Sequence, residues 1–219
     1  MSIRFRTSSS LQSVSVMTDP NNTSPPIEPS VVYDFDPHNL PAGYLEAVGL
    51  VVAASAQTED SMSDLIGGLL GIDNMDTAAV ATHMSFPLKS QVIRALAELK
   101  TNQTSFIDEL DDLLDTVKDA MDKRNVLVHN PLLRNPDTNE VFSWRLKARG
   151  SLQLDLKPIT VDEIKQDAAL IYEVGLSILT FMESCGIPHT YRQTPLMMPL
   201  DRGKKARAKR REAALKSGG

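Results

Sequence analysis

The residues from Phe106 to His129 carry the most regular pattern in this 219-residue chain. Apolar side chains recur there at helical spacing and mark one face of a long α-helix: Phe106, Leu110, Leu113, Leu114, Val117, Met121 and Val128. The opposite face is rich in Asp and Lys, and Asn130-Pro131 ends the helix because proline disfavours the helical conformation in the residue before it. A long helix with a single apolar face requires other helices to cover that face.

A second helical pattern follows Pro41-Ala42-Gly43. Its apolar and small side chains recur at steps of three or four: Tyr44, Ala47, Val48, Val51, Ser55, Thr58, Met62 and Ile66. We expect Gly67-Gly68 and Gly71 to weaken and then end this helix. Glu59 lies close to the stripe although it is charged, so it either sits at the edge or reaches a cationic partner inside. The edge position is favoured, because charged residues on helices are usually solvated.

Three more helices complete the helical content. A short one is expected from Asp76 to Met84 and another from Ser85 to Lys100. Thr160 and Glu163 are spaced as a capping box, which opens a final helix that runs to Cys185. Gly186 and Pro188 close that helix.

Residues 141–146 and 152–156 alternate between apolar and polar side chains, which predicts a small β-hairpin around Arg149-Gly150. The predicted fold is therefore all-α, an antiparallel helical bundle with this hairpin inserted before the last helix. We divide the chain into a disordered or loosely attached segment at residues 1–40, a helical bundle domain at 41–190 and a basic tail at 191–219.

The net charge of −5 is unevenly distributed. The residues from Pro195 onward carry +6, which leaves −11 on the rest of the chain. The basic residues of this tail that we consider candidates for nucleic-acid binding are Lys204, Lys205, Arg207, Lys209, Arg210 and Arg211. Such a block either contacts RNA or DNA or stays solvated, and it can fold as a helix when a partner supplies the surface.

Several classes of protein do not fit the sequence. The single cysteine, Cys185, excludes an internal disulfide framework, and no Cys/His cluster has the spacing of a zinc site, so we expect neither a metal nor another cofactor. The N-terminus lacks the apolar stretch of a secretory signal. The longest apolar run, Val48 to Ala56, falls far short of the roughly 20 residues that cross a bilayer. These features predict a cytoplasmic protein that does not interact with membranes.

The candidate catalytic residues lie at the end of the long helix. Asn125 and His129 are four residues apart and share a helical face, while Arg124 is displaced from His129 by about 140°. Together an arginine, an amide and an imidazole can bind a phosphate, orient it and move a proton. The alternative is structural: His129 complements the helix dipole, Arg124 pairs with a carboxylate, and Asn125 caps a turn.

The motif Arg124-Asn125-x-x-x-His129, at the end of a long amphipathic helix within a bundle from about Tyr44 to Cys185, resembles the signature of the HEPN superfamily (higher eukaryotes and prokaryotes nucleotide-binding domains), which is Arg, four to six residues, then His. The segment from Ala81 to Phe86, followed by a Leu-rich helix and this motif, resembles a group of uncharacterised bacterial proteins in that superfamily.

The resemblance implies a metal-independent ribonuclease, often a homodimer in which two motifs face one another across a shared cleft. Many members act in toxin-antitoxin, antiviral or RNA-processing systems, so RNA, a second copy and a protein partner or antitoxin are the implied partners. Carried over to this chain, Arg124 would hold the scissile phosphate, and His129 would be the general acid or base for attack by the ribose 2′-hydroxyl. Asn125 would position one of them.

Two other readings remain open. In the first, the motif residues form a pocket that binds a nucleotide, or the bundle binds a protein, and no catalysis takes place. In the second, the basic tail is the functional element and the bundle only dimerises it. We expect His83 to form local hydrogen bonds rather than to join the site, and Phe142 and Trp144 to cover the end of the bundle rather than to stack on a base.

Overall fold

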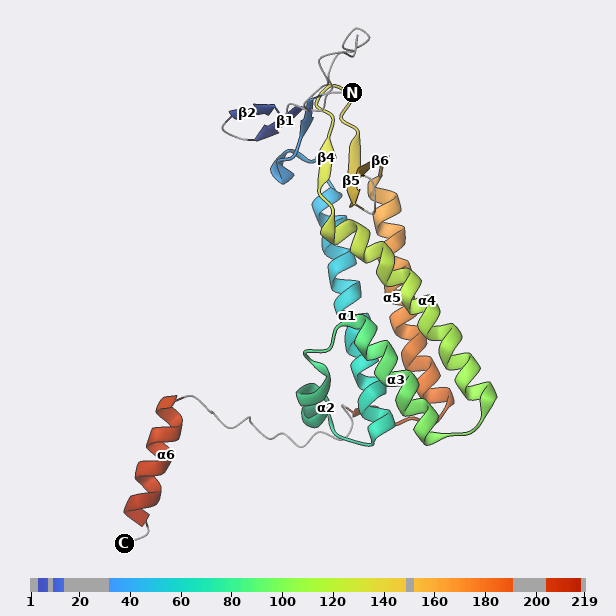
Figure 1. Cartoon of the computed structure of the whole chain (residues 1–219), viewed down its shortest axis with the longest axis vertical. Helices are drawn as coiled ribbons and strands as arrows, with labels where there is room; N and C mark the ends of the chain where they lie inside the picture. Colours follow the sequence, from blue (N-terminus) through green and yellow to red (C-terminus); the bar gives the residue numbers. More distant parts are fainter. Residues whose placement is uncertain (1–3, 8–9, 14–31, 149–151, 191–203, 218–219) are drawn as a thin grey trace.

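The computed structural model describes residues 4–7, 10–13, 32–148, 152–190 and 204–217, and most of these residues are helical. The helices are α1 (Tyr44–Leu70), α2 (Asn74–Ala81), α3 (Phe86–Lys100), α4 (Thr104–His129), α5 (Val161–Ser184) and α6 (Lys204–Ser217), with a short 3-10 helix, η1, at Pro37–Asn39. The strands are β1 (Arg4–Thr7), β2 (Ser10–Ser13), β3 (Val32–Asp34), β4 (Leu132–Arg134), β5 (Val141–Ala148) and β6 (Leu152–Pro158). A small sheet lies at one end of the long helices (Figure 1).

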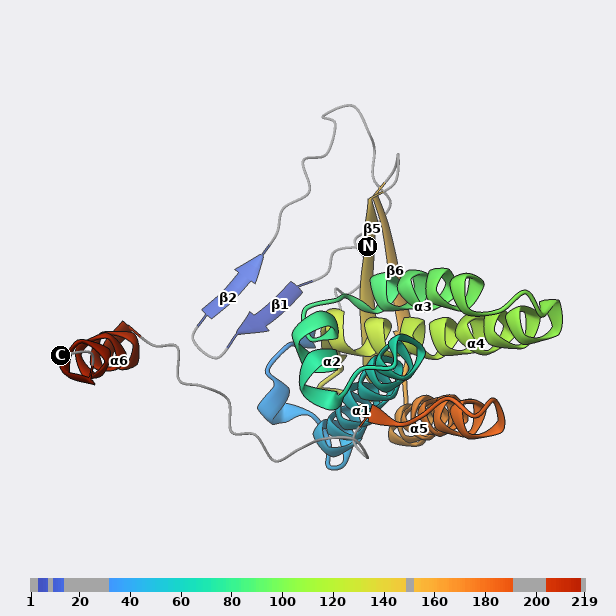
Figure 2. The same cartoon turned by 90° about the horizontal axis from the view of Figure 1, so that it is seen from below.

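The core lies between α1, α3, α4 and α5. The side chains that the helical pattern of α4 assigned to its apolar face supply part of it, since Leu110, Leu114, Val117 and Met121 are buried. Burial of each such side chain contributes about 1.5–3 kcal/mol to folding. Figure 2 shows α3 beside α4, and α1 beside α5. α4 therefore joins the core along its length, and its last turn is held in place near the sheet.

α1 and α5 form the most extensive helix pair, and they run parallel. Near the start of both helices, the Tyr44 hydroxyl donates to the carbonyl of Ile159 over 2.9 Å. Further along, the Thr58 hydroxyl donates to the carbonyl of Ile171 over 2.8 Å. The predicted antiparallel arrangement is wrong for this pair. Because α4 carries the chain back to the end where α1 begins, and β4 to β6 stay at that end, α5 starts beside the start of α1 (Figure 1).

Gly71 ends α1, as the sequence predicted, and the helix continues through Gly67 and Gly68 before it. Gly67 and Gly68 are helical and buried, and only Gly71, with φ of 70°, ends the helix. A Cβ atom on Gly67 would collide with Thr77, and one on Gly68 would collide with Ile187 and the backbone of the following residue. The absent side chains allow neighbouring segments to approach α1 closely.

The predicted helix boundaries hold to within a few residues. α4 begins at Thr104, two residues earlier than predicted, and ends at His129 as predicted. Asn130 is extended, with φ −111° and ψ 136°, as expected for a residue before proline. The predicted capping box of Thr160 and Glu163 is present at the start of α5. The short α2 occupies residues 74–81 rather than 76–84.

The sheet is larger than the single predicted hairpin. Its strand order is β2-β1-β3-β4-β5-β6, and the four strands from β3 to β6 pair antiparallel. β5 and β6 pair at the positions where alternation predicted two strands. Three of the other strands come from the segment that we expected to be disordered or loosely attached. Tyr33 of β3 is buried, and its ring meets that of Phe142 edge-on at 5.6 Å, which ties this segment to β5.

The basic tail contains the helix α6, which stands apart from the other helices in both views (Figures 1 and 2). Part of the tail, residues 191–203, lies outside the described residues. Among the helices described, none combines the length and the apolar character that crossing a bilayer requires.

Candidate functional site

The last turn and a half of α4 brings Arg124, Asn125 and His129 together. Arg124 Nη1 donates to Asn125 Oδ1 over 3.0 Å and lies 3.3 Å from His129 Nε2. The long arginine side chain therefore spans the 140° that separates its Cα position from that of His129. Since a guanidinium can only donate hydrogen bonds, Nε2 can act only as the acceptor in this contact.

The environment of Arg124 differs from that of an ordinary surface arginine. The side chain is half-buried, and its Nε is shielded from solvent without a hydrogen-bond partner among the described residues. No carboxylate of the described residues lies within 4.0 Å of the Arg124 guanidinium. The structural alternative, in which Arg124 is held by an acidic partner, thus finds no support in the described residues. A half-buried guanidinium without a counterion favours binding of an anion.

Asn125 and His129 are exposed, so the groups beside Arg124 are accessible from solvent. The capping role considered for Asn125 belongs instead to Asn130, whose Nδ2 donates to the carbonyl of Val126 over 2.7 Å. Asn125 is consequently available to orient the Arg124 guanidinium, as its 3.0 Å hydrogen bond shows.

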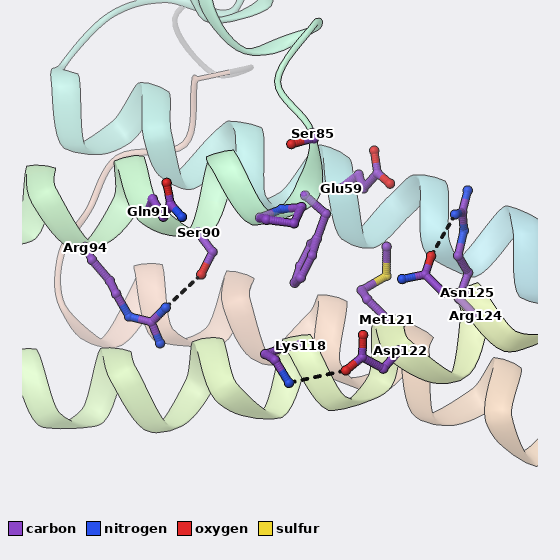
Figure 3. A pocket seen from close by; sticks show the side chains of 12 residues that line it. Glu59, Ser85, Ser90, Gln91, Arg94, Lys118, Met121, Asp122, Arg124 and Asn125 are labelled. Carbon is purple, nitrogen blue, oxygen red and sulfur yellow. Dashed lines mark hydrogen bonds and ion pairs between the residues drawn. The ribbon is translucent and has the colours of Figure 1, made fainter. Parts of the chain in front are cut away.

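Two hollows meet at this motif. The larger, with a volume of about 520 Å³, lies between α1, α3 and α4 and is lined by Glu59, Ser85, Phe86, Pro87, Ser90, Gln91, Arg94, Lys118, Met121, Asp122, Arg124 and Asn125. We call it the helical cavity; Figure 3 shows Arg124 and Asn125 at one end of it and Arg94 at the other. The smaller hollow, of about 440 Å³, is lined by Asp122, Asn125, Val126, His129, Asn130 and Arg145. Asp122 and Asn125 line both, so the two hollows are neighbours on the surface of α4.

The charges around the helical cavity are mixed, although the body of the protein is acidic. Lys118 Nζ lies 3.2 Å from Asp122 Oδ2, and the hydrogen bond to Asp122 raises the pKa of Lys118. Arg94 contacts Asp111 at 2.6 Å and Asp115 at 2.8 Å, and the hydrogen bond to Asp111 raises the pKa of this arginine. Both side chains therefore stay cationic and lie where a polyanion would reach the cavity.

Glu59 occupies the edge of the α1 stripe, as the sequence favoured, and there it lines the helical cavity. It is half-buried, and its carboxylate has no hydrogen bond or ion pair within the described ranges. Its backbone carbonyl accepts a 2.9 Å hydrogen bond from the buried ammonium of Lys89. Burial lowers the pKa of Lys89, while the nearby charges of Glu59 and Asp60 act in the opposite direction.

The remaining predicted residues lie elsewhere. Lys204, Lys205, Arg207, Lys209, Arg210 and Arg211 are all on α6, away from the motif (Figures 1 and 2). His83 is exposed between α2 and α3 and lines neither hollow. Trp144 packs against Phe35, with ring centroids 5.2 Å apart, so it covers part of the sheet.

The sequence did not point to several residues around the motif. Phe86, Ser90 and Gln91 come from α3, and Arg145 comes from β5. Phe86 belongs to the segment that resembles a group of bacterial proteins, and this was its only signal in the sequence. No sequence pattern indicated a role for Ser90, Gln91 or Arg145. The sequence also gave no role to His189. This residue is buried, and its Nδ1 lies 2.7 Å from Asp64 Oδ2, so the contact joins the segment after α5 to α1.

No group of three or more His, Cys, Asp or Glu side chains that could hold a metal ion occurs in the described residues. Comparison of the chain with models of protein families, with curated proteins and with solved structures found no match.

Proposed function

We propose that this protein is a HEPN-like, metal-independent endoribonuclease in which Arg124 and His129 form the active site. The observation that carries the proposal is the 3.3 Å separation of Arg124 Nη1 and His129 Nε2 at an accessible surface. The guanidinium without a carboxylate partner supplies an anion site, and the exposed imidazole beside it supplies a group that can exchange a proton. This pairing of groups favours reaction at a phosphate.

The reaction we propose is transesterification within RNA. His129 Nε2 accepts the proton of a ribose 2′-hydroxyl while the 2′-oxygen attacks the adjacent phosphorus. The 2′-O–P bond forms, the P–O5′ bond breaks, and the products are a 2′,3′-cyclic phosphate and a 5′-hydroxyl. Arg124 stabilises the negative charge that grows on the non-bridging oxygens, and Asn125 keeps the guanidinium in place through its 3.0 Å hydrogen bond.

The leaving 5′-oxygen needs a proton, and a single motif contains one imidazole. We propose that His129 of a second copy, as the protonated imidazolium, donates it and becomes neutral. The support is a row of exposed, uncharged residues along α1, formed by Leu45, Gly49, Val52 and Ala56. We call this the α1 row. Leu45 and Val52 are 55% and 47% exposed, and the row leads to Glu59 at the helical cavity, so a copy docked on it would lie beside the motif.

The basic helix α6 would gather RNA by contacting its phosphates. The acidic body repels a polyanion at long range, whereas the side chains of Lys205, Arg207 and Lys209 on α6 are exposed. Sequence-independent attraction of this kind raises the local concentration of substrate without selecting a cleavage position. A role in toxin-antitoxin or antiviral defence, with an antitoxin or other protein partner, belongs to the same proposal.

Incubation of the full chain with labelled RNA in EDTA tests the proposal. Wild type should cleave and leave 2′,3′-cyclic phosphate ends, whereas Arg124→Ala and His129→Ala should lose about a hundredfold or more of the rate. His83→Ala is the matched control, because that histidine is exposed and lines neither hollow. Undiminished cleavage by both motif variants, with melting temperatures equal to wild type, would reject the nuclease.

The size of the helical cavity favours a second candidate function. About 520 Å³ is enough for a mononucleotide, so the fold can serve as a nucleotide- or RNA-binding module without turnover. This alternative predicts saturable binding and a rise in melting temperature with nucleotide, together with intact RNA after prolonged incubation.

A further inference from the structure

The helical cavity extends well beyond the groups that the proposed cleavage chemistry uses. Phe86 and Pro87 from the start of α3 and Met121 from α4 give it an apolar part. The other residues that line it are polar or charged, and Ser90, Gln91 and Glu59 are among them. A concave site of this volume that has an apolar part can hold a small ring system, and its polar groups can orient that ring.

We propose that the helical cavity is a nucleobase subsite, which holds the base of the nucleotide next to the scissile phosphate and prefers guanine. The proposal rests on the proposed function, because it places the phosphate at Arg124. Arg124 and Asn125 line the cavity themselves, so a base inside it would be attached to a phosphate at the Arg124 guanidinium. Figure 3 shows these two residues where α4 approaches α1, with Glu59 projecting from α1 close by.

The charges inside the cavity favour a base over a second phosphate. Asp122 is engaged by Lys118 at 3.2 Å, whereas the carboxylate of Glu59 accepts no hydrogen bond and forms no ion pair among the residues described, although the charge of Lys89 lies near it. A half-buried carboxylate repels a phosphate and accepts hydrogen bonds only. A neutral ligand that presents N–H donors can satisfy the Glu59 carboxylate without placing a second anion beside it.

Guanine fits this requirement better than the other bases. Its N1–H and its exocyclic amino group are adjacent donors, and they match the two oxygens of one carboxylate. Uracil presents a single ring N–H between two carbonyl oxygens, which Glu59 would repel. Phe86 supplies an aromatic ring on which any base can stack, so it contributes affinity while Glu59 contributes selectivity.

Equilibrium binding of ribonucleoside monophosphates to the full chain tests the subsite. The probes are guanosine and uridine monophosphates, with the phosphate on the 3′- or the 5′-oxygen to show which neighbour of the scissile phosphate is bound. We expect guanosine to bind at least about tenfold more tightly than uridine in one of the two series. Glu59→Gln should abolish that preference, and the matched control Glu109→Gln, at an exposed position of α4, should keep it.

Phe86→Leu keeps an apolar side chain at the start of α3 but removes the flat ring. It should weaken binding of every base by about fivefold or more. Melting temperatures without nucleotide, compared with wild type, show that each variant is folded. Absence of binding by all four probes, or equal binding of guanosine and uridine that Glu59→Gln leaves unchanged, would overturn the subsite.

Cleavage assays separate this inference from the nuclease proposal. If the wild type cleaves RNA beside guanine and Glu59→Gln cleaves without that preference, both stand. If it cleaves equally beside all four bases, the nuclease stands and the subsite is refuted. If it cleaves no RNA, the nuclease fails, and the binding of the monophosphates still decides the subsite.

Discussion

The buried ammonium of Lys89 donates a hydrogen bond of 2.9 Å to the backbone carbonyl of Glu59. Lys89 lies in the first turns of α3, so the bond ties that end of α3 to the middle of α1. Glu59 and the neighbouring residues of α3 line the helical cavity, whose shape therefore depends on this contact. A buried cation is a costly way to join two helices, and its cost depends on pH.

Stability should rise at alkaline pH because of Lys89. Burial lowers the pKa of Lys89 from the ordinary 10.5, so the folded protein loses this proton at lower pH than the unfolded chain. Between the two values the unfolded state binds more protons, and the free energy of unfolding increases with pH. Urea denaturation from neutral pH toward 10.5 should show wild type gaining stability relative to Lys89→Met. Parallel pH profiles for the two proteins would contradict this.

Arginine at position 124 should not be replaceable by lysine. Arg124→Lys keeps the charge but loses the planar fork that contacts Asn125 and His129 together. We expect kcat for RNA cleavage to fall by about tenfold or more, with KM changed less, because the lost contacts act on charge that develops during reaction. A lysine variant with wild-type kcat would show that charge alone suffices.

A charge in the α1 row should separate the two copies. Val52→Glu places a carboxylate in the proposed contact, and sedimentation velocity should then show a monomer with reduced RNA cleavage. Leu50→Glu is the matched control, because Leu50 is 46% exposed but lies about 160° around α1 from Val52. Identical sedimentation of Val52→Glu and wild type would remove the α1 row as the dimer contact.

Removal of α6 should weaken RNA binding without affecting chemistry. A chain ended after Asp201 lacks the six candidate basic residues of the helix and should bind RNA about tenfold or more weakly at low salt. The dependence of the logarithm of affinity on the logarithm of salt concentration should flatten, because fewer counterions are released. The rate at saturating RNA should stay close to wild type. An unchanged salt slope would show that α6 makes no phosphate contacts.

The glycines of α1 should differ sharply in their tolerance of alanine. Gly68→Ala adds a Cβ that meets the carbonyl of Pro188 at 2.5 Å and Ile187 at 2.7 Å, so it should lower the free energy of unfolding by about 1–3 kcal/mol. Gly49→Ala meets nothing within 4 Å and should raise it by about 0.5–1 kcal/mol through helix propensity. Chemical denaturation measures both, and equal effects would show that close packing at Gly68 is unimportant.

Local patterns predicted the helices well and the sheet poorly. α4 was found from its apolar spacing, and its end at His129 from Asn130-Pro131, because both signals depend on residues that are neighbours along the chain. β3 and β4 have three residues each, too few for alternation to be recognised, and they pair with each other although they lie far apart in sequence. The N-terminal segment was therefore described by its composition alone, and its contacts with β5 were missed.

For the candidate site, the amino-acid sequence by itself determined which residues stand at the end of α4, because helix periodicity and proline act over one or two turns. It could not determine that Arg124 reaches His129, since a long side chain chooses its conformation from its surroundings. Only the tertiary structure decided that α1 and α5 run parallel and that α1 and α3 complete a cavity beside Arg124. These arrangements depend on packing between segments that are distant in sequence, and such contacts leave no periodic signal along the chain.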